Sequence, residues 1–166
     1  MTVLHLVTYS GADPLVMNES KYVLKKTWWK STLSENWRAY VEGQLPTSSH
    51  CEEITLLTSL NGANHTESGG YHYIVETDIS KESEEEFNAW YDTEHLPGLA
   101  SVPGTISAKR FLRTSGSPRY IACYELISPE VMKSKEWLAI RHTAWSSRIR
   151  PMFMNTVREL FVRTNK

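Results

Sequence analysis

The spacing of apolar residues in the second half of the chain alternates between the period of a strand and that of a helix. After Gly69-Gly70, aromatic and β-branched residues recur over 71–79, which predicts a strand. Ser83 then precedes three glutamates and apolar residues at helical spacing, which predicts a capped helix that weakens at Pro97. A strand followed by an amphipathic helix therefore opens this half of the chain.

The pattern further along predicts two more strands, a second helix and a last strand. Residues 106–113 and 119–126 have the pattern of strands, and the turn-rich segment between them suits a hairpin. Pro129 suits the first position of a helix, and the helical pattern continues to about Pro151. Residues 156–163 then form a strand. This order is that of the ferredoxin-like split unit, so we predict an α+β fold.

Residues 1–62 resemble part of the unit that residues 71–166 contain completely. An alignment by hand places aromatic and proline positions of the two segments together, including Trp29 on Trp145. We therefore expect an N-terminal partial repeat of strand, helix and strand, with 52–60 as its last strand, and one compact domain overall. The alternative is that both segments are ordinary strand-to-helix junctions, where proline recurs for local reasons.

The predicted N-terminal helix includes two adjacent tryptophans. Trp28 and Trp29 cannot both face inward from one helix, so one of them should contact a ligand, a partner subunit or another part of the N-terminal half.

Composition excludes several classes of partner. The chain has 166 residues, of which 40% are hydrophobic, and this suits one hydrophobic core. Its net charge of -1 argues against a nucleic-acid partner. No apolar run approaches the length that spans a bilayer, and the N-terminus lacks the pattern of a secretory signal, so we expect a cytoplasmic protein with no membrane partner.

Cys51 and Cys123 lie far apart, which gives little support to a disulfide or a thiolate zinc site. Cys51 directly follows His50, an arrangement that suits a base and nucleophile poorly.

One stretch carries a family resemblance. The sequence W-Y-D-T-E-H-L-P-G-L from Trp90, followed by V-P-G-T-I-S-A-K-R-F and P-R-Y-I-A-C-Y-E-L, resembles the EthD-like branch of the dimeric α+β barrel superfamily. The resemblance covers roughly 71–163. It implies two ferredoxin-like sheets packed as a barrel, usually across a homodimer, with a cavity between each sheet and its helices. Relatives include lactone isomerases, decarboxylases, dehydratases, quinol-forming monooxygenases and haem enzymes.

The same stretch contains residues suited to proton transfer. His95 follows Tyr91 and Asp92 by about one helical turn, so the three side chains can lie on neighbouring faces. Asp92 could orient the imidazole, which then exchanges a proton near neutral pH, while Tyr91 donates to a developing oxyanion. The alternative is that His95 and Glu94 form a structural helix end. The resemblance adds weight to His95, because the matching histidine of relatives lies near the cavity.

Four further residues are candidates to bind a substrate. His72 and Glu76 share one face of the strand over 71–79. Trp90 lies in the predicted helix, and Arg110 lies in the predicted strand that follows it. Burial would raise the pKa of Glu76, whereas the alternative for Glu76 is a salt bridge to Arg110 or Arg158.

Arginines that follow the second predicted helix are candidates as well. Arg148 and Arg150 could bind a carboxylate, although a helix end also favours cations.

Cofactor sites are less well supported. His72 with Glu76, or Asp92 with His95, gives two metal ligands and no third, so we expect no metal. His95 or His142 could be an axial ligand for haem, but nothing in the sequence is specific for haem.

These observations favour a cofactor-independent enzyme that moves protons on a small cyclic or aromatic substrate, as an isomerase, decarboxylase or dehydratase. Two alternatives remain: a non-catalytic binding or assembly protein, and a haem- or oxygen-dependent monooxygenase. A barrel completed within one chain would be monomeric and an extended module would dimerise, and we expect a homodimer.

Overall fold

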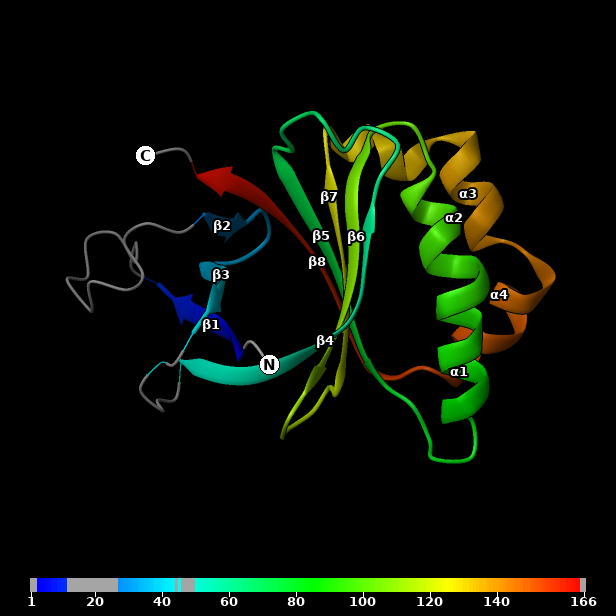
Figure 1. Ribbon diagram of the computed structural model, residues 1–166, viewed down its shortest axis with the longest axis horizontal. Helices are drawn as coiled ribbons and strands as arrows, with labels where there is room; N and C mark the ends of the chain where they lie inside the picture. Colours follow the sequence, from blue (N-terminus) through cyan, green and yellow to red (C-terminus); the bar gives the residue numbers. More distant parts are fainter. Residues whose placement is uncertain (1–2, 12–26, 44, 46–49, 165–166) are drawn as a thin grey trace.

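Eight antiparallel strands close into a barrel in the computed structural model, which describes residues 3–11, 27–43, 45 and 50–164 (Figure 1). The order around the barrel is β1-β3-β2-β8-β5-β7-β6-β4, and β4 pairs with β1 to close it. The strands are β1 (Leu4–Ser10), β2 (Trp28–Ser31), β3 (Asn36–Glu42), β4 (Cys51–Asn61), β5 (Tyr71–Asp78), β6 (Thr105–Arg113), β7 (Tyr120–Leu126) and β8 (Met154–Thr164).

The helices of the described chain lie together on one side of the barrel, outside β5 to β8 (Figure 1). They form two connections, one between β5 and β6 and one between β7 and β8. The first contains α1 (Glu84–Trp90), a π-helix η1 (Tyr91–His95) and α2 (Leu96–Ala100). The second contains the short 3₁₀ helices η2 (Pro129–Lys133) and η3 (Arg150–Met152), with α3 (Lys135–Arg141) and α4 (Ala144–Ile149) between them.

The C-terminal half confirms the predicted ferredoxin-like unit. Each predicted strand is present, and the order β8-β5-β7-β6 is that of the split unit. The helix ends differ in detail. Ser83 makes no side-chain cap bond, although its carbonyl accepts from the N–H of Phe87, whereas the hydroxyls of Ser134 and Thr143 cap α3 and α4.

The N-terminal half contributes four strands, whose order β2-β3-β1-β4 matches β6-β7-β5-β8. The last strand of the predicted partial repeat is present as β4. Residues 14–26 of the predicted helix lie outside the described residues. Trp28 and Trp29 lie in β2 rather than in a helix, and both are buried. Successive side chains of a strand point to opposite faces. Trp29 therefore packs with the barrel interior and Trp28 packs with Trp37 on the outside, which explains how both are covered.

Closure of the barrel within one chain is the intramolecular arrangement that the sequence left open. The pairs β2–β8 and β4–β6 join the two halves, so both sheet junctions are made by one polypeptide. The homodimer and the boundaries 1–62 and 71–166 stay predictions. Among the described residues, no helix has the length and apolar character needed to cross a bilayer.

Two hydrophobic cores lie on opposite faces of the C-terminal sheet. Ile74, Phe111, Ile121 and Phe161 point into the barrel. On the other face, the strands pack against the helices through a larger core that includes Trp90. A side chain on β5 therefore reaches either the barrel interior or the helix layer, and the two environments hold different candidate sites.

Candidate active site

The first helical connection contains a wider, π-helical turn at the predicted site. The N–H of Leu96 donates to the carbonyl of Tyr91, five residues back, so Tyr91–His95 is one π-helical turn. Pro97 supplies a reason, because it has no N–H for the carbonyl of Thr93 and its ring would crowd that group in an α-helix. Such turns are rare and often occur at functional sites. Here the wider turn buries both Tyr91 and His95 under the helix layer.

A small pocket lies between this turn and the outer face of the sheet. Its volume is about 70 Å³, which is room for roughly two water molecules. Side chains from β5, β7, η1, α3 and β8 surround it, so distant parts of the chain meet there. The lining residues are Tyr73, Val75, Trp90, Tyr91, His95, Leu99, Tyr124, Met132, Trp137, Arg141, Arg150, Phe153 and Arg158.

Three cations line this pocket without a carboxylate partner in the described part of the chain. They are Arg141, Arg150 and Arg158, and none of them forms an ion pair with the acidic residues that the structure describes. Burial lowers the pKa of Arg150, and the neighbouring Arg141 and Arg158 lower it further. Accumulated positive charge of this kind favours an anion in the pocket.

Tyrosine hydroxyls of the pocket are protonated donors. Burial raises the pKa of Tyr91 to about 12 and raises that of Tyr73, although nearby arginines oppose both shifts. The pKa of Tyr124 lies well above its ordinary value, again because of burial. The Tyr124 hydroxyl is buried without a hydrogen-bond partner in the structure. Buried polar groups are normally paired, so this hydroxyl is available to a bound ligand.

His95 is a neutral ring in the folded protein. It stacks on Trp90 with ring centroids 4.2 Å apart, and its Nδ1 atom is buried without a partner. Burial lowers the pKa of His95 to about 3, and Arg150, Arg141 and Arg110 contribute to the shift. The imidazole can accept or donate a hydrogen bond, but it is a weak base near neutral pH.

Asp92 and Arg110 belong to a neighbouring cluster. Asp92 is exposed and pairs with Arg110 through a 3.2 Å contact, and it also accepts from Thr58. No hydrogen bond joins it to His95, so the structure does not show Asp92 orienting the imidazole. The Arg110 guanidinium lies 4.3 Å from the centroid of the Tyr91 ring. Arg110 thus packs under η1, and it does not line the pocket.

His72 and Glu76 lie on the opposite face of β5. Glu76 pairs with Arg38 at 2.7 Å and with Arg113 at 3.2 Å inside the barrel, not with Arg110 or Arg158 as the sequence suggested. Burial favours a higher pKa for Glu76, but Arg38 and Arg113 outweigh it and lower the pKa. The structure therefore separates the predicted residues into a helix-side set and a barrel set.

The sequence identified one of the pocket arginines and missed its partners. Arg150 lines the pocket, as its candidate role required, whereas Arg148 pairs with Glu86 on the surface. Arg141 and Arg158 were not foreseen as its neighbours, because they lie on α3 and β8. Only the folded topology brings these three together.

Comparison with known proteins supports the fold. No protein-family model and no curated protein matches the sequence. Among solved structures, the chain is similar to a monooxygenase-like protein from Listeria innocua, with a TM-score of 0.71, 13% identity, and coverage of 100% of this chain and 95% of the other. An anthrone oxidase-like protein gives a TM-score of 0.61 at 14% identity, covering 99% and 91% of the two chains. A haem-degrading enzyme from Listeria monocytogenes gives 0.62 at 12% identity, covering 95% and 98%.

These similarities correct the expected function. The sequence favoured a cofactor-independent isomerase, decarboxylase or dehydratase, but the similar structures are described as a monooxygenase-like protein, an anthrone oxidase-like protein and a haem-degrading enzyme. The geometry agrees with the correction, since the low pKa of His95 and its separation from Asp92 remove the basis for acid/base catalysis by that pair. The α+β barrel fold is supported, whereas the EthD-like branch is not shown.

Haem does not fit the helix-side pocket or the histidines suggested for it. A porphyrin is far larger than a 70 Å³ pocket, and one face of His95 is covered by Trp90. His142 is exposed. Inside the barrel, the Nε2 atom of His72 already bonds the Tyr40 hydroxyl at 2.8 Å. His95, His142 and the Nε2 atom of His72 therefore offer no free axial nitrogen in an apolar pocket of suitable size.

Proposed function

We propose that the protein is an oxygen-dependent monooxygenase that oxidises a small, electron-rich phenolic or anthrone-type compound, whose acidic oxygen binds in the helix-side pocket while its rings lie at the opening of the pocket. The observation that carries this proposal is the group of three arginines, Arg141, Arg150 and Arg158, which have no carboxylate partner among the described residues and lie beside protonated tyrosine hydroxyls. Such a pocket binds a phenolate or enolate more tightly than the neutral compound. The functions described for the similar folds add support.

The chemistry needs an electron-rich anion and dioxygen. The bound compound loses its acidic proton to solvent when the cations stabilise its anion. A ring carbon of the anion then reacts with dioxygen. One oxygen atom becomes a carbonyl of the product and the other becomes water, while the organic compound supplies all four electrons. A phenol would yield a quinone, and an anthrone would yield an anthraquinone, without an external reductant.

Each group of the pocket has a defined role in this scheme. Arg150 and Arg141 are partly buried and stabilise the anionic oxygen, while the exposed Arg158 lies where a larger part of the substrate meets solvent. Tyr124 donates a hydrogen bond to the same oxygen. Neutral His95 offers its unpaired Nδ1 atom as a hydrogen-bond partner, not as a general base.

The test is oxygen uptake with a panel of one oxidisable compound per class: a single-ring hydroquinone, a naphthalenediol and an anthrone. We expect at least one compound to consume oxygen above its autoxidation rate. With ¹⁸O₂, mass spectrometry should find one labelled oxygen in the product. If the panel binds without oxygen uptake, the protein is a binding protein and the proposal is wrong.

Arg150→Gln should lower kcat/KM by about a hundredfold, because an oxyanion loses a preorganised cation. Arg148→Gln is the matched control, since Arg148 pairs with Glu86 on the surface and should leave the activity unchanged. Equal activity of the two variants would remove the pocket from the mechanism. EthD-like membership is a further part of this proposal, resting on the Trp90 to Phe111 sequence.

A further inference from the structure

A second and larger cavity lies inside the barrel, on the other face of β5. Its volume is about 360 Å³, within the usual range of pockets that hold small organic ligands. It is separated from the helix-side pocket by the sheet, because His72 lines the cavity and Tyr73 lines the pocket. The lining residues are Leu4, Thr27, Trp29, Tyr40, Glu42, Leu56, His72, Ser107, Lys109, Phe111, Cys123, Glu125 and Arg163.

Aromatic rings form the inner wall of this cavity. Trp29 stacks on His72 with centroids 4.9 Å apart, and Tyr40 stacks on Phe111 at 5.4 Å. These rings come from strands of both halves of the chain. Flat aromatic walls favour a flat ring as the ligand, through stacked or edge-to-face contacts.

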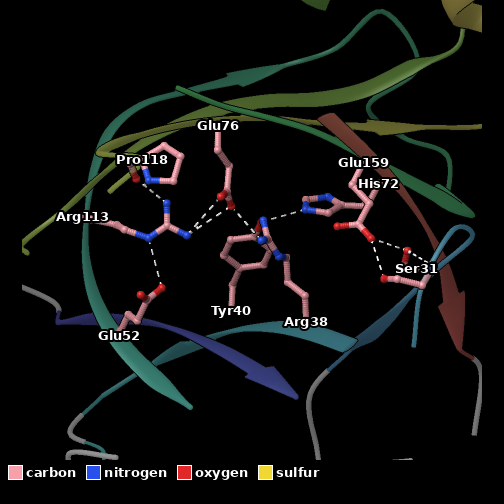
Figure 2. Close-up of polar contacts among 10 residues, drawn as sticks. Ser31, Arg38, Tyr40, Glu52, His72, Glu76, Arg113, Pro118 and Glu159 are labelled. Atoms are coloured by element: carbon pink, nitrogen blue, oxygen red, sulfur yellow. Dashed lines mark hydrogen bonds and ion pairs between the residues drawn. The ribbon is translucent and has the colours of Figure 1, made fainter. Parts of the chain in front are cut away.

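Polar groups behind the wall hold two of the rings in place. Figure 2 shows the Tyr40 hydroxyl bonded to His72 and lying beside Arg38, which pairs with Glu76. Arg113 continues this network from Glu76 to Glu52. Burial and the cations Arg38 and Lys109 lower the pKa of His72 well below its ordinary value, so the ring facing the cavity is neutral. The network thus presents a fixed, uncharged hydrogen-bonding wall.

The outer part of the cavity carries balanced charge. Lys109 and Arg163 are its cations, and Glu42 and Glu125 are its anions. Arg163 donates to Ser68, and Glu125 accepts from the N–H of Gly69. No excess of either sign is left to attract a charged ligand.

We propose that the barrel cavity binds an uncharged aromatic compound of one or two rings that carries a hydroxyl or similar hydrogen-bonding group. The rings of the ligand lie against the wall that the Trp29–His72 and Tyr40–Phe111 pairs form, and the polar group meets His72 or Tyr40. This site is independent of the oxidation proposed for the helix-side pocket.

The test is calorimetric titration of the full chain with 2-naphthol, compared with 2-naphthalenesulfonate. We expect one 2-naphthol in the barrel cavity of each chain, and at least tenfold weaker binding of the sulfonate in that cavity, because the cavity offers no net positive charge. Tighter binding of the sulfonate that the cavity variants described next weaken, or no binding of 2-naphthol, would overturn the proposal.

Variants locate the binding. Ser107→Phe and Leu56→Trp each place a larger side chain in the cavity, and the expected effect is a loss of affinity for 2-naphthol of about tenfold or more. Leu56 is 42% exposed, so its substitution provides a folded variant if Ser107→Phe disturbs the core. Ser115→Phe in the exposed β6–β7 turn is the matched control and should bind normally.

A third variant separates the two sites. Arg150→Gln alters the helix-side pocket and should leave 2-naphthol binding unchanged, whatever it does to oxidation. Loss of binding in Arg150→Gln, with normal binding in both folded cavity variants, would place 2-naphthol in the helix-side pocket and contradict the proposal.

Discussion

The imidazole of His95 stacks on the indole of Trp90, with ring centroids 4.2 Å apart and planes inclined by 22°. Burial in this position lowers the pKa of His95 to about 3, whereas an unfolded histidine titrates near 6.5. Above pH 6.5 both states are neutral. Below it, the unfolded chain binds a proton that folded His95 does not, so the free energy of unfolding falls as pH falls from 6.5 towards 3.

The expected loss from His95 is about 2 kcal/mol between pH 7 and pH 5, measured by urea denaturation. His95→Phe keeps a ring against Trp90 but does not titrate, so its loss over this range should be smaller by that amount. His72 contributes in the same direction, because its pKa is also lowered. Parallel pH profiles of the wild type and His95→Phe would show that His95 is accessible to protons in the folded state.

The separation of His95 from His72 shows what the sequence could predict about the site. Helical spacing correctly brought Trp90, Tyr91 and His95 together, because neighbours on one helix are set by local geometry. The strand pattern put His72 and Glu76 on one face of β5, and this is what the structure shows. Periodicity could not say which face meets the helices, since both faces of β5 carry apolar residues and both are covered.

The same limit explains why β3, one of two N-terminal strands that the sequence analysis missed, was not recognised. On β3, Trp37, Ala39 and Val41 pack outside the barrel while Arg38 lies buried inside it. A strand that is buried on both faces lacks the alternation of apolar and polar residues from which strands are predicted. A buried arginine also makes the inward face of the strand look polar in the sequence. The C-terminal strands kept enough aromatic and β-branched character to be recognised.

Glu76 is predicted to be essential to the stability of the barrel. It lies between Arg38 and Arg113, and all three side chains are less than 10% exposed. Glu76→Gln should cost about 3 kcal/mol of unfolding free energy, because two buried cations lose their counter-charge. Glu52→Gln is the control, since the Glu52 side chain is 42% exposed and its pair with Arg113 is worth about 1 kcal/mol or less. Equal losses in denaturant titrations would mean that Glu76 is not the centre of the network.

Gly62 is predicted to tolerate no side chain. A Cβ atom there would lie 2.1 Å from the carbonyl oxygen of Thr105, so β4 and β6 would have to separate. Gly62→Ala should therefore lower the unfolding free energy by about 2 kcal/mol or more. Gly70→Ala is the matched control, because a Cβ at Gly70 meets nothing within 4 Å. A thermal melt in which both variants behave alike would contradict the close approach at Gly62.

The two cysteines should differ in reactivity towards a thiol reagent such as DTNB. Cys51 is partly exposed, whereas Cys123 is buried in the barrel wall and burial raises its pKa to about 12. At pH 8 roughly one Cys123 thiol in ten thousand is ionised, and the thiolate is the reactive form. In folded Cys51→Ser, labelling should therefore be slow and should require the barrel to open.

This dependence on opening connects Cys123 with the buried ion pairs. Glu76→Gln, combined with Cys51→Ser, should accelerate labelling of Cys123 in proportion to the stability that it loses, provided that reclosing is faster than the reaction. Gly70→Ala in the same background should leave the rate unchanged. If Cys123 reacts rapidly in all three proteins, the thiol is reached without unfolding, and the barrel interior at Cys123 is open to reagents of that size.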